Sequence, residues 1–208
     1  MLLDGGFVRK RFRQVTQRAI TASEVRPLAE RLLDPRTEEL FRVYFYDCAP
    51  SEDSTTHPIS GKPLNLRSTR AYRDNSEFQE ALGRTEQVAL RKGELAFRGW
   101  RLTPGATRDL IQNGPRTLRD DDVEMNLNQK GIDMEIGLDV AWLAVRRIVD
   151  RIVLCTGDRD FVPAMKLARR EGVQVVLATL GATAHATLLE HADFIRPCLP
   201  AALPDPSR

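Results

Sequence analysis

Two aspartates separated by one residue, Asp158 and Asp160, follow an apolar run that ends at Cys155. Carboxylates this close repel each other unless a cation or a proton lies between them. Clusters of carboxylate oxygens suit Mg²⁺ or Mn²⁺, which keep several waters and also bind phosphate oxygens. A helix cap would explain one of these acids, but a further aspartate, Asp4, follows the first apolar residues of the chain. We therefore expect a divalent-metal site centred on Asp158 and Asp160.

A fourth acid, Asp133, falls in the first turn of an expected helix, where the helix dipole favours a carboxylate whatever its function. Asp139 comes six residues later, which is about 120° round the helix and roughly 9 Å along it. The two side chains therefore do not both point at one small site. Because a lone buried carboxylate is costly, we expect Asp139 to be an anchor that pairs with Lys130 or with an arginine.

Alternating strand and helix signals position these acids and predict an α/β fold, with a mainly parallel sheet flanked by helices. The last third predicts three helices and three strands in alternation. Their ranges are Asp133–Val149, Arg151–Cys155, Phe161–Glu171, Val173–Ala178, Ala184–His191 and Asp193–Arg196. Loops after parallel strands meet at one edge of the sheet, so we expect the acids to converge there.

The first two thirds are less regularly patterned. Met1–Leu3 predicts a short strand, and Phe41–Tyr46 predicts a second strand that ends at Asp47. Further expected elements are helices at Glu24–Leu33, Glu38–Leu40 and Ser76–Lys92 and a strand at Glu94–Leu102. Residues 48–67, rich in Ser, Thr, Pro and Gly, predict a loop, and residues 103–129 give no clear pattern. The short first strand leaves two explanations open, a truncated strand or a true start farther upstream.

The composition limits the classes of function that fit the chain. Hydrophobic residues make up 42% of the 208 residues, and no apolar run approaches the roughly 20 residues that cross a bilayer, so we expect no membrane segment. Widely spaced Cys48, Cys155 and Cys198 favour reduced thiols in the cytoplasm over disulfides or zinc. The net charge of +2 is too small to mark a general nucleic-acid binder. Basic clusters at residues 8–18 and 67–73 suit a polyanionic substrate, or are solvated helix faces.

Three stretches in the last third form a specific combined motif: KGIDMEIGLDVAWLA, IVLCTGDRDFVPAMKLARREGVQVVLATLG and LLEHADFIR. Together they closely resemble the NYN domain, and more specifically the LabA-like branch of the PIN-like nuclease superfamily. The motif positions of that family fall here on Asp4, Asp133, Asp139, Thr156–Phe161 and Ala192–Ile195. The resemblance implies a single Rossmann-like PIN/NYN domain over residues 1–197. The composition predicts a Pro-rich tail after it, at residues 198–208.

The same resemblance implies a metal-dependent ribonuclease that hydrolyses RNA phosphodiester bonds with Mg²⁺ or Mn²⁺. The residues that carry over as the catalytic and metal-binding set are Asp4, Asp133, Asp158 and Asp160, with Asp139 as an outer anchor. One metal ion would activate water and another would stabilise the leaving oxygen. By position, the candidate phosphate contacts are Lys130, Thr156 and Arg159. RNA is the expected partner, and a homodimer stays open.

Two other functions fit the residues. A non-catalytic RNA-binding or regulatory module would keep the fold and its acids, and it would bind RNA without metal and without turnover. A small-molecule phosphohydrolase also uses Asp-x-Asp after a strand, but it needs a second acid two residues after Asp4, where this chain has Gly6. The chain also departs from the NYN pattern, with Phe7 where many relatives have Asn and with Thr156 in place of Ser.

Overall fold

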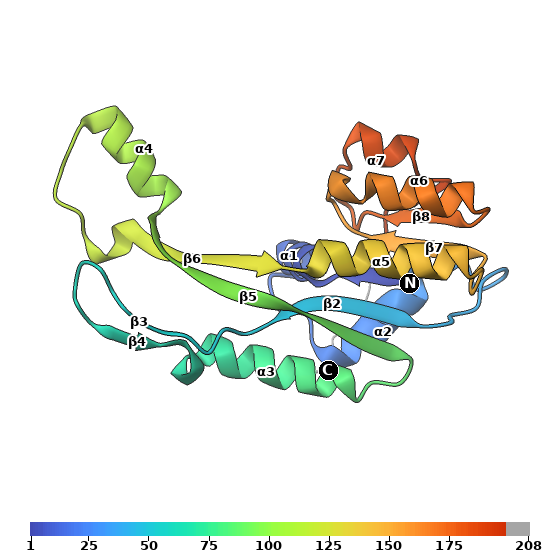
Figure 1. The fold of residues 1–208 in the computed structure, drawn as a ribbon, viewed down its shortest axis with the longest axis horizontal. Helices are drawn as coiled ribbons and strands as arrows, with labels where there is room; N and C mark the ends of the chain where they lie inside the picture. The colour runs from blue at the N-terminus through green and yellow to red at the C-terminus, as the bar shows by residue number, and fades with distance from the viewer. Residues whose placement is uncertain (199–208) are drawn as a thin grey trace. The chain divides into compact units, whose positions relative to one another are not determined.

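One mainly parallel sheet runs through the part of the chain that the computed structural model describes, which is residues 1–198. Its strands are β1 (Leu2–Asp4), β2 (Val43–Ala49), β5 (Val88–Leu102), β6 (Val123–Lys130), β7 (Arg151–Cys155), β8 (Gln174–Ala178) and β9 (Phe194–Arg196). They follow the order β6-β5-β2-β1-β7-β8-β9 (Figure 1). β1 pairs in parallel with β2 and β7, β8 pairs in parallel with β7 and β9, and β5 and β6 are antiparallel. The expected α/β class with a mainly parallel sheet is confirmed.

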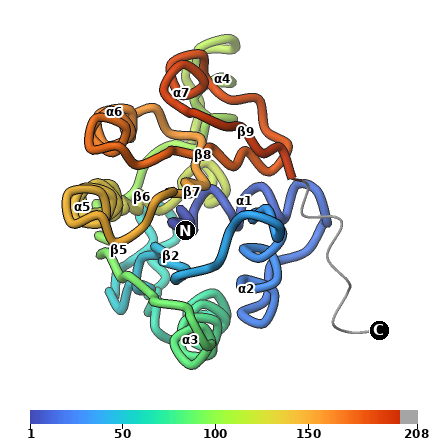
Figure 2. Tube along the Cα trace, turned by 90° about the vertical axis from the view of Figure 1, so that its right-hand side faces the viewer, coloured from blue at the N-terminus to red at the C-terminus, as the bar shows by residue number. Residues whose placement is uncertain are grey.

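Helices cover both faces of the parallel strands. The helices of the described residues are α1 (Gly5–Thr16), α2 (Ala22–Arg31), α3 (Arg70–Gly83), α4 (Pro104–Asn113), α5 (Ile132–Val145), α6 (Val162–Arg170) and α7 (Ala186–Glu190). Figure 2 shows α1 and α2 on one side of β7 and β8, and α5 and α6 on the other. Because these strands are covered on both faces, residues 152–155 and 175–178 are uniformly apolar and buried. Within residues 1–198, no helix has the length and apolar character that a membrane span requires.

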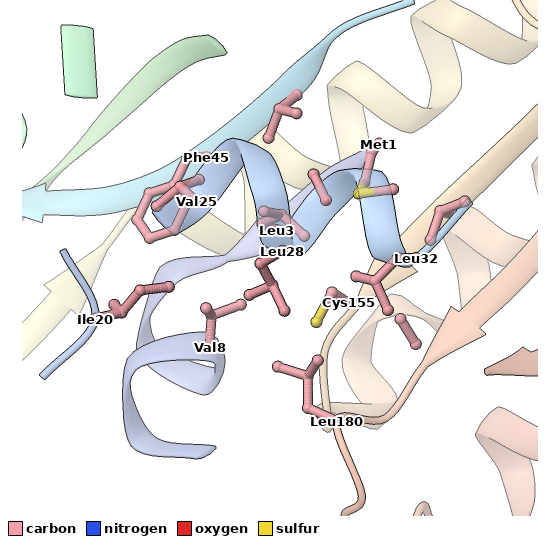
Figure 3. Close-up of a cluster of buried hydrophobic side chains, with 14 of the residues drawn as sticks. Met1, Leu3, Val8, Ile20, Val25, Leu28, Leu32, Phe45, Cys155 and Leu180 are labelled. Carbon is pink, nitrogen blue, oxygen red and sulfur yellow. The ribbon is translucent and has the colours of Figure 1, made fainter. Parts of the chain in front are cut away.

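The short central strand β1 is held in place by burial. Leu2 and Leu3 have no exposed surface, and β1 lies between β2 and β7. Leu3 belongs to a buried apolar cluster that includes Val8 of α1 and Cys155 of β7 (Figure 3). Burying a leucine side chain fully contributes roughly 1.5–3 kcal/mol. Three residues are therefore enough to fix the place at which Asp4 begins α1.

The chain forms two compact units built from alternating segments. The first unit contains Met1–Asp47, Glu77–Gly93 and the chain from Gly131 onward. The second contains Cys48–Ser76 and Glu94–Lys130 and includes α4, β6 and a hairpin of β3 (Ser54–Thr56) and β4 (Pro63–Asn65). The single domain expected over residues 1–197 stays a prediction. The Pro-rich tail expected at residues 198–208 lies, apart from Cys198, outside the described residues.

Helix α1 was not indicated by the sequence pattern. It begins with Gly5 and Gly6, and glycine lowers helix propensity by about 1 kcal/mol relative to alanine. The first of these glycines is required by packing, because a Cβ on Gly5 would lie 2.3 Å from the backbone oxygen of Tyr46 in β2. Tertiary packing therefore outweighs local propensity at this position.

Two expected helices between residues 38 and 92 are corrected. The helix expected at Glu38–Leu40 is wrong, because the Glu38 side chain accepts a hydrogen bond from the Asp34 backbone N–H at 2.7 Å and closes a turn. The helix expected at Ser76–Lys92 is too long, since α3 ends at Gly83 and β5 follows.

Two stretches in the second unit are more ordered than their sequence indicates. Residues 48–67, expected to be a loop, contain the β3–β4 hairpin. Residues 103–129 contain α4 and most of β6. In β6, Val123, Met125 and Leu127 alternate with polar residues, which is the period of a strand, over a stretch too short to stand out.

Candidate functional site

The pairing of β1 with β7 brings Asp4 and Thr156 together. Leu3 lies opposite Cys155 in the parallel register, so the next residue of each strand emerges at the same edge of the sheet. Asp4 caps α1, since its Oδ1 accepts a hydrogen bond from the Phe7 backbone N–H at 3.1 Å. The Thr156 hydroxyl donates to Asp4 Oδ2, also at 3.1 Å. Both oxygens of this carboxylate are therefore positioned by the protein.

The loop after β7 is fixed by a short chain of hydrogen bonds. The backbone N–H of Asp158 donates to the Thr156 hydroxyl at 3.1 Å. Asp158 Oδ1 in turn accepts from the Asp160 backbone N–H at 2.9 Å, which caps the 3₁₀ turn Arg159–Phe161. The Thr156 hydroxyl thus connects Asp4 with the turn that carries the other two acids.

Gly157 lets this loop approach α1. A Cβ at Gly157 would lie 2.8 Å from the Phe7 ring, far closer than a side chain can pack. Phe7 of α1 therefore covers this loop. The aromatic ring packs against the backbone between Thr156 and Asp158.

The four acids of the expected set share one electrostatic environment. Burial raises the pKa of Asp4, hydrogen bonds from Phe7 and Thr156 oppose that rise, and repulsion from Asp133 adds to it. Asp133 lies in the first turn of α5, where partial loss of hydration raises its pKa and repulsion from Asp158 and Asp160 raises it further. Within residues 1–198, none of the four forms an ion pair with a basic side chain. None of these carboxylates is therefore directly paired with a cation in the described residues.

This donor set suits a hard divalent cation in its chemistry, because every donor is a carboxylate oxygen. Its side chains do not form a ready coordination sphere. In the described residues, no group of three or more His, Cys, Asp and Glu side chains is arranged to hold a metal ion.

A pocket of about 640 Å³ opens beside Asp4 and Asp158. It is lined by α1, by the loop after β7 and by the segment between β8 and α7. Its lining also carries the cationic side chains of Lys10, Arg11 and Arg159. Acids and bases therefore meet at one concave surface, an arrangement that suits a phosphate ester near bound cations.

Arg11 is the cation whose position is best defined. Its guanidinium donates to the Leu180 backbone oxygen through Nε at 3.3 Å and through Nη2 at 3.2 Å, and to the Gln14 side chain at 2.7 Å. None of these partners is a carboxylate, so its positive charge stays available to an anion. Lys10 and Arg159 form no ion pair in residues 1–198 either.

Lys10 and Arg11 were noted in the sequence only as part of a basic cluster. The signal that would have placed them is helical spacing, because Phe7, Arg11 and Gln14 recur every three or four residues after Asp4 and share one face of α1. That face becomes visible only once α1 itself is identified.

Asp139 is held away from the other acids. Its Oδ2 forms an ion pair with Arg91 Nε at 3.0 Å and accepts a hydrogen bond from the Tyr46 hydroxyl at 2.8 Å. Burial and the neighbouring Asp139 carboxylate raise the pKa of Tyr46, so the phenol stays a donor. Asp139 therefore anchors α5 to β2 and to the start of β5, and an arginine supplies its counter-charge.

The other expected residues fall in different places. Lys130 ends β6 and belongs to the second unit. Thr156 is buried, and its only proton is donated to Asp4, so its hydroxyl positions the acids. Asp47, at the end of the second predicted strand, pairs with Arg9 at 3.0 Å and accepts from Gln79 at 3.2 Å.

Acids at the carboxyl edge of a parallel sheet, with a pocket beside them that cationic side chains line, place the chain among the α/β proteins whose ligand site lies at this edge. The family model of the NYN domain matches residues 59–197, more than half of the chain, and the chain belongs to this family. The family places it in the PIN-like nuclease superfamily. The match contains Asp133, Asp158 and Asp160, while Asp4 precedes it.

Two further comparisons add little. No curated protein matches the chain. A solved structure of a protein of unknown function, VPA0982 from Vibrio parahaemolyticus RIMD 2210633, is similar with a TM-score of 0.49 and 18% identity. The alignment covers 94% of this chain and 89% of that one.

Proposed function

We propose that this NYN-domain chain is a metal-dependent ribonuclease of the LabA-like branch, acting in the cytoplasm on RNA phosphodiester bonds. The observation that carries the proposal is the pocket at the carboxyl edge of the sheet. There, acids without counter-ions stand beside Lys10, Arg11 and Arg159, which have no carboxylate partners in residues 1–198.

Asp4, Asp133, Asp158 and Asp160 are the proposed holders of Mg²⁺ or Mn²⁺. Burial raises the pKa of Asp4 and of Asp133, and repulsion among the acids raises both further; a divalent cation would relieve this repulsion. When bound, the metal supplies an activated water and stabilises the leaving oxygen.

The remaining residues orient the acids and the RNA. The Thr156 hydroxyl holds Asp4 and the Asp158 turn in a fixed relation. Arg11 and Arg159 lie in the pocket where they can neutralise RNA phosphates, and Arg is suited to bind phosphate through two parallel hydrogen bonds.

Cleavage of labelled single-stranded RNA tests the proposal, with Mn²⁺, with Mg²⁺ and with EDTA. We expect metal-dependent cleavage that Asp158→Asn reduces by at least about 100-fold, since the substitution removes a charged ligand. The matched control is Asp150→Asn, which changes an exposed aspartate next to the opposite end of β7. Equal cleavage by wild type and Asp158→Asn would exclude this site.

A second function, RNA binding without cleavage, is favoured by the absence of a ready metal-binding group in residues 1–198. It predicts that RNA binding persists in EDTA and that no product forms even at high protein concentration. The same set of reactions, read also for binding, separates the two functions.

A further inference from the structure

The solvent-facing side of α5 is apolar. Met134, Leu138, Trp142 and Val145 are 71%, 62%, 52% and 57% exposed. Their spacing of four, four and three residues places them on one face of the helix. The opposite side of α5 packs on the first unit through residues such as Ile136, which is fully buried. A run of large exposed apolar side chains on one element marks an interaction surface.

Small residues border this face on one side. Gly137 has open space where its Cβ would be, and Ala141 follows one turn later. Small side chains let a second helix approach closely, as ridges of one helix enter grooves of the other. The bordering charges lie on the other side of the face. Glu135 and Arg146 lie about 60° and 80° round the helix from Leu138, at the two ends of the apolar run.

These two charges have no counter-charge within the described residues. Glu135 takes part in no ion pair, and one of its carboxylate oxygens is buried without a hydrogen-bond partner. Arg146 is exposed, caps the C-terminus of α5 and forms no ion pair in residues 1–198. The face therefore carries an acid near its N-terminal end and a base near its C-terminal end.

We propose that this face binds the same face of a second copy of the chain, with the two α5 helices antiparallel about a twofold axis. In such a pair, a residue a given number of places before the axis faces the residue the same number of places after it. An axis level with residue 140 sets Leu138 against Trp142 of the partner subunit. A shift of half a residue, which is less than about 1 Å, sets Met134 against Val145 of the partner subunit.

The charges obey the same symmetry. Glu135 and Arg146 lie equally far from a level between residues 140 and 141, again within about 1 Å of the axis. Because a twofold axis keeps each flank of the helix on the same side, Glu135 then meets Arg146 of the partner subunit twice in the dimer. This self-complementarity of residue spacing and charge favours a second copy over an unrelated partner.

The proposed interface leaves the candidate site open. Asp133 lies about 140° round α5 from Leu138, so this acid, the one member of the set on α5, faces away from the paired surface. The inference is therefore independent of the proposed nuclease function. A single helix pair is a small interface beside the roughly 1,200–2,000 Å² of a stable complex, so we expect a dimer that dissociates on dilution.

Sedimentation or light scattering of the full chain tests this inference, from about 1 to about 200 µM. We expect wild type to approach twice the 23.5 kDa of one chain at the upper end of the range. Leu138→Glu should raise the dissociation constant by at least about 100-fold, because it introduces charges at the centre of the interface. The control is Ile111→Glu, a change at another exposed apolar residue, 79% exposed in α4, which should leave the mass unchanged. Circular dichroism confirms that each variant folds.

Charge exchange tests the antiparallel register. Glu135→Arg and Arg146→Glu should each weaken the dimer by about 10-fold, and the double variant should recover to within about 3-fold of wild type. If the wild type stays monomeric over the whole concentration range, the proposal is overturned and the apolar face of α5 would have to bind a different partner. A dimer insensitive to Leu138→Glu overturns it as well, and a double variant that fails to recover overturns the antiparallel arrangement.

Discussion

At the residue scale, Thr156 controls the geometry of the candidate site through one hydroxyl group. It donates to Asp4 and accepts from the Asp158 backbone, and it is buried, so water cannot replace either bond without moving the loop. Its function is positional, because its single proton is already committed to a carboxylate.

Replacing Thr156 with Val should leave the shape of the core and remove both hydrogen bonds. We expect RNA cleavage to fall by about 10- to 100-fold, as it does when groups that orient metal ligands are lost. The unpaired Asp4 oxygen and Asp158 N–H should lower the free energy of unfolding by about 1–3 kcal/mol. Steady-state cleavage and urea denaturation measure the two effects.

Thr156→Ser is the matched control, since it keeps the hydroxyl and loses only a methyl group. It should stay within about 3-fold of wild type in cleavage. If Val and Ser substitutions reduce cleavage equally, the hydroxyl has no positioning role and the effect lies in packing.

The sequence identified the acidic residues of the site but not the basic ones. Asp158 and Asp160 stand out because two carboxylates separated by one residue repel each other unless a cation or a proton lies between them. In the sequence, Lys10 and Arg11 cannot be told from the basic residues of any solvated helix face. They line the pocket because Asp4 caps α1 and so fixes where that helix begins. The sequence shows which residues could bind a metal ion or a phosphate. Which of them line the pocket depends on where α1 begins, and the sequence pattern did not indicate that helix.

At the scale of secondary-structure elements, the segment between α2 and β2 is fastened by Glu38. Its side chain is only 8% exposed and receives hydrogen bonds from Arg196 of β9 at 2.6 and 2.7 Å and from Arg151 of β7. Burial alone would raise the pKa of Glu38, but these donors outweigh it and lower the pKa to about 2, from an ordinary value of 4.5. One carboxylate thus connects a loop to two strands that lie more than 100 residues later in the chain.

Because the folded pKa lies below the unfolded one, Glu38 stabilises the fold fully above pH 4.5 and loses that contribution as the pH falls toward 2. Glu38→Gln should therefore lower the free energy of unfolding at pH 7 by about 3 kcal/mol and flatten its decline between those pH values. Denaturant unfolding across that range measures both effects.

The neighbouring Glu39→Gln is the control for this measurement. Glu39 is exposed and takes part in no ion pair within residues 1–198, so its substitution should leave the pH profile unchanged. A wild-type slope in the Glu38→Gln variant would mean that Glu38 is not a major source of acid sensitivity.

The same segment shows where element prediction from sequence fails. Glu38–Leu40 contains good helix formers, yet the Glu38 side chain closes a turn by accepting a hydrogen bond from the Asp34 backbone. It also binds Arg151 and Arg196, which are too distant in sequence for a local pattern to associate with it. The strands Arg151–Cys155 and Val173–Ala178 were predicted well because buried parallel strands leave uniform apolar runs.

At the scale of the whole molecule, metal binding should be visible as stability. A ligand that binds only the folded state stabilises it by about 2.7 kcal/mol when present at about 100 times its dissociation constant. For a chain of this size, each kcal/mol raises Tm by about 2–4 °C. We expect Mn²⁺ to raise the Tm of the wild type by several degrees and to do so less for Asp4→Asn and Asp133→Asn.

The control for this prediction is again Asp150→Asn, which should respond to Mn²⁺ as wild type does. Equal shifts in all variants would place the metal elsewhere. This readout needs no RNA and no turnover, so it tests the metal site apart from the nuclease reaction.

The position of β1 in the sheet has a consequence for the order of folding. Leu2 pairs with Leu154 across 152 positions of sequence, and Asp4 meets Thr156 by the same pairing. Contacts between such distant residues form late, because closing a long loop costs entropy before the contact returns any stability. The pairing of β1 with β2 spans far less sequence, so β1 can join the sheet before β7 does. The contact between Asp4 and Thr156 must wait for β7, and the candidate site is therefore assembled among the last steps of folding.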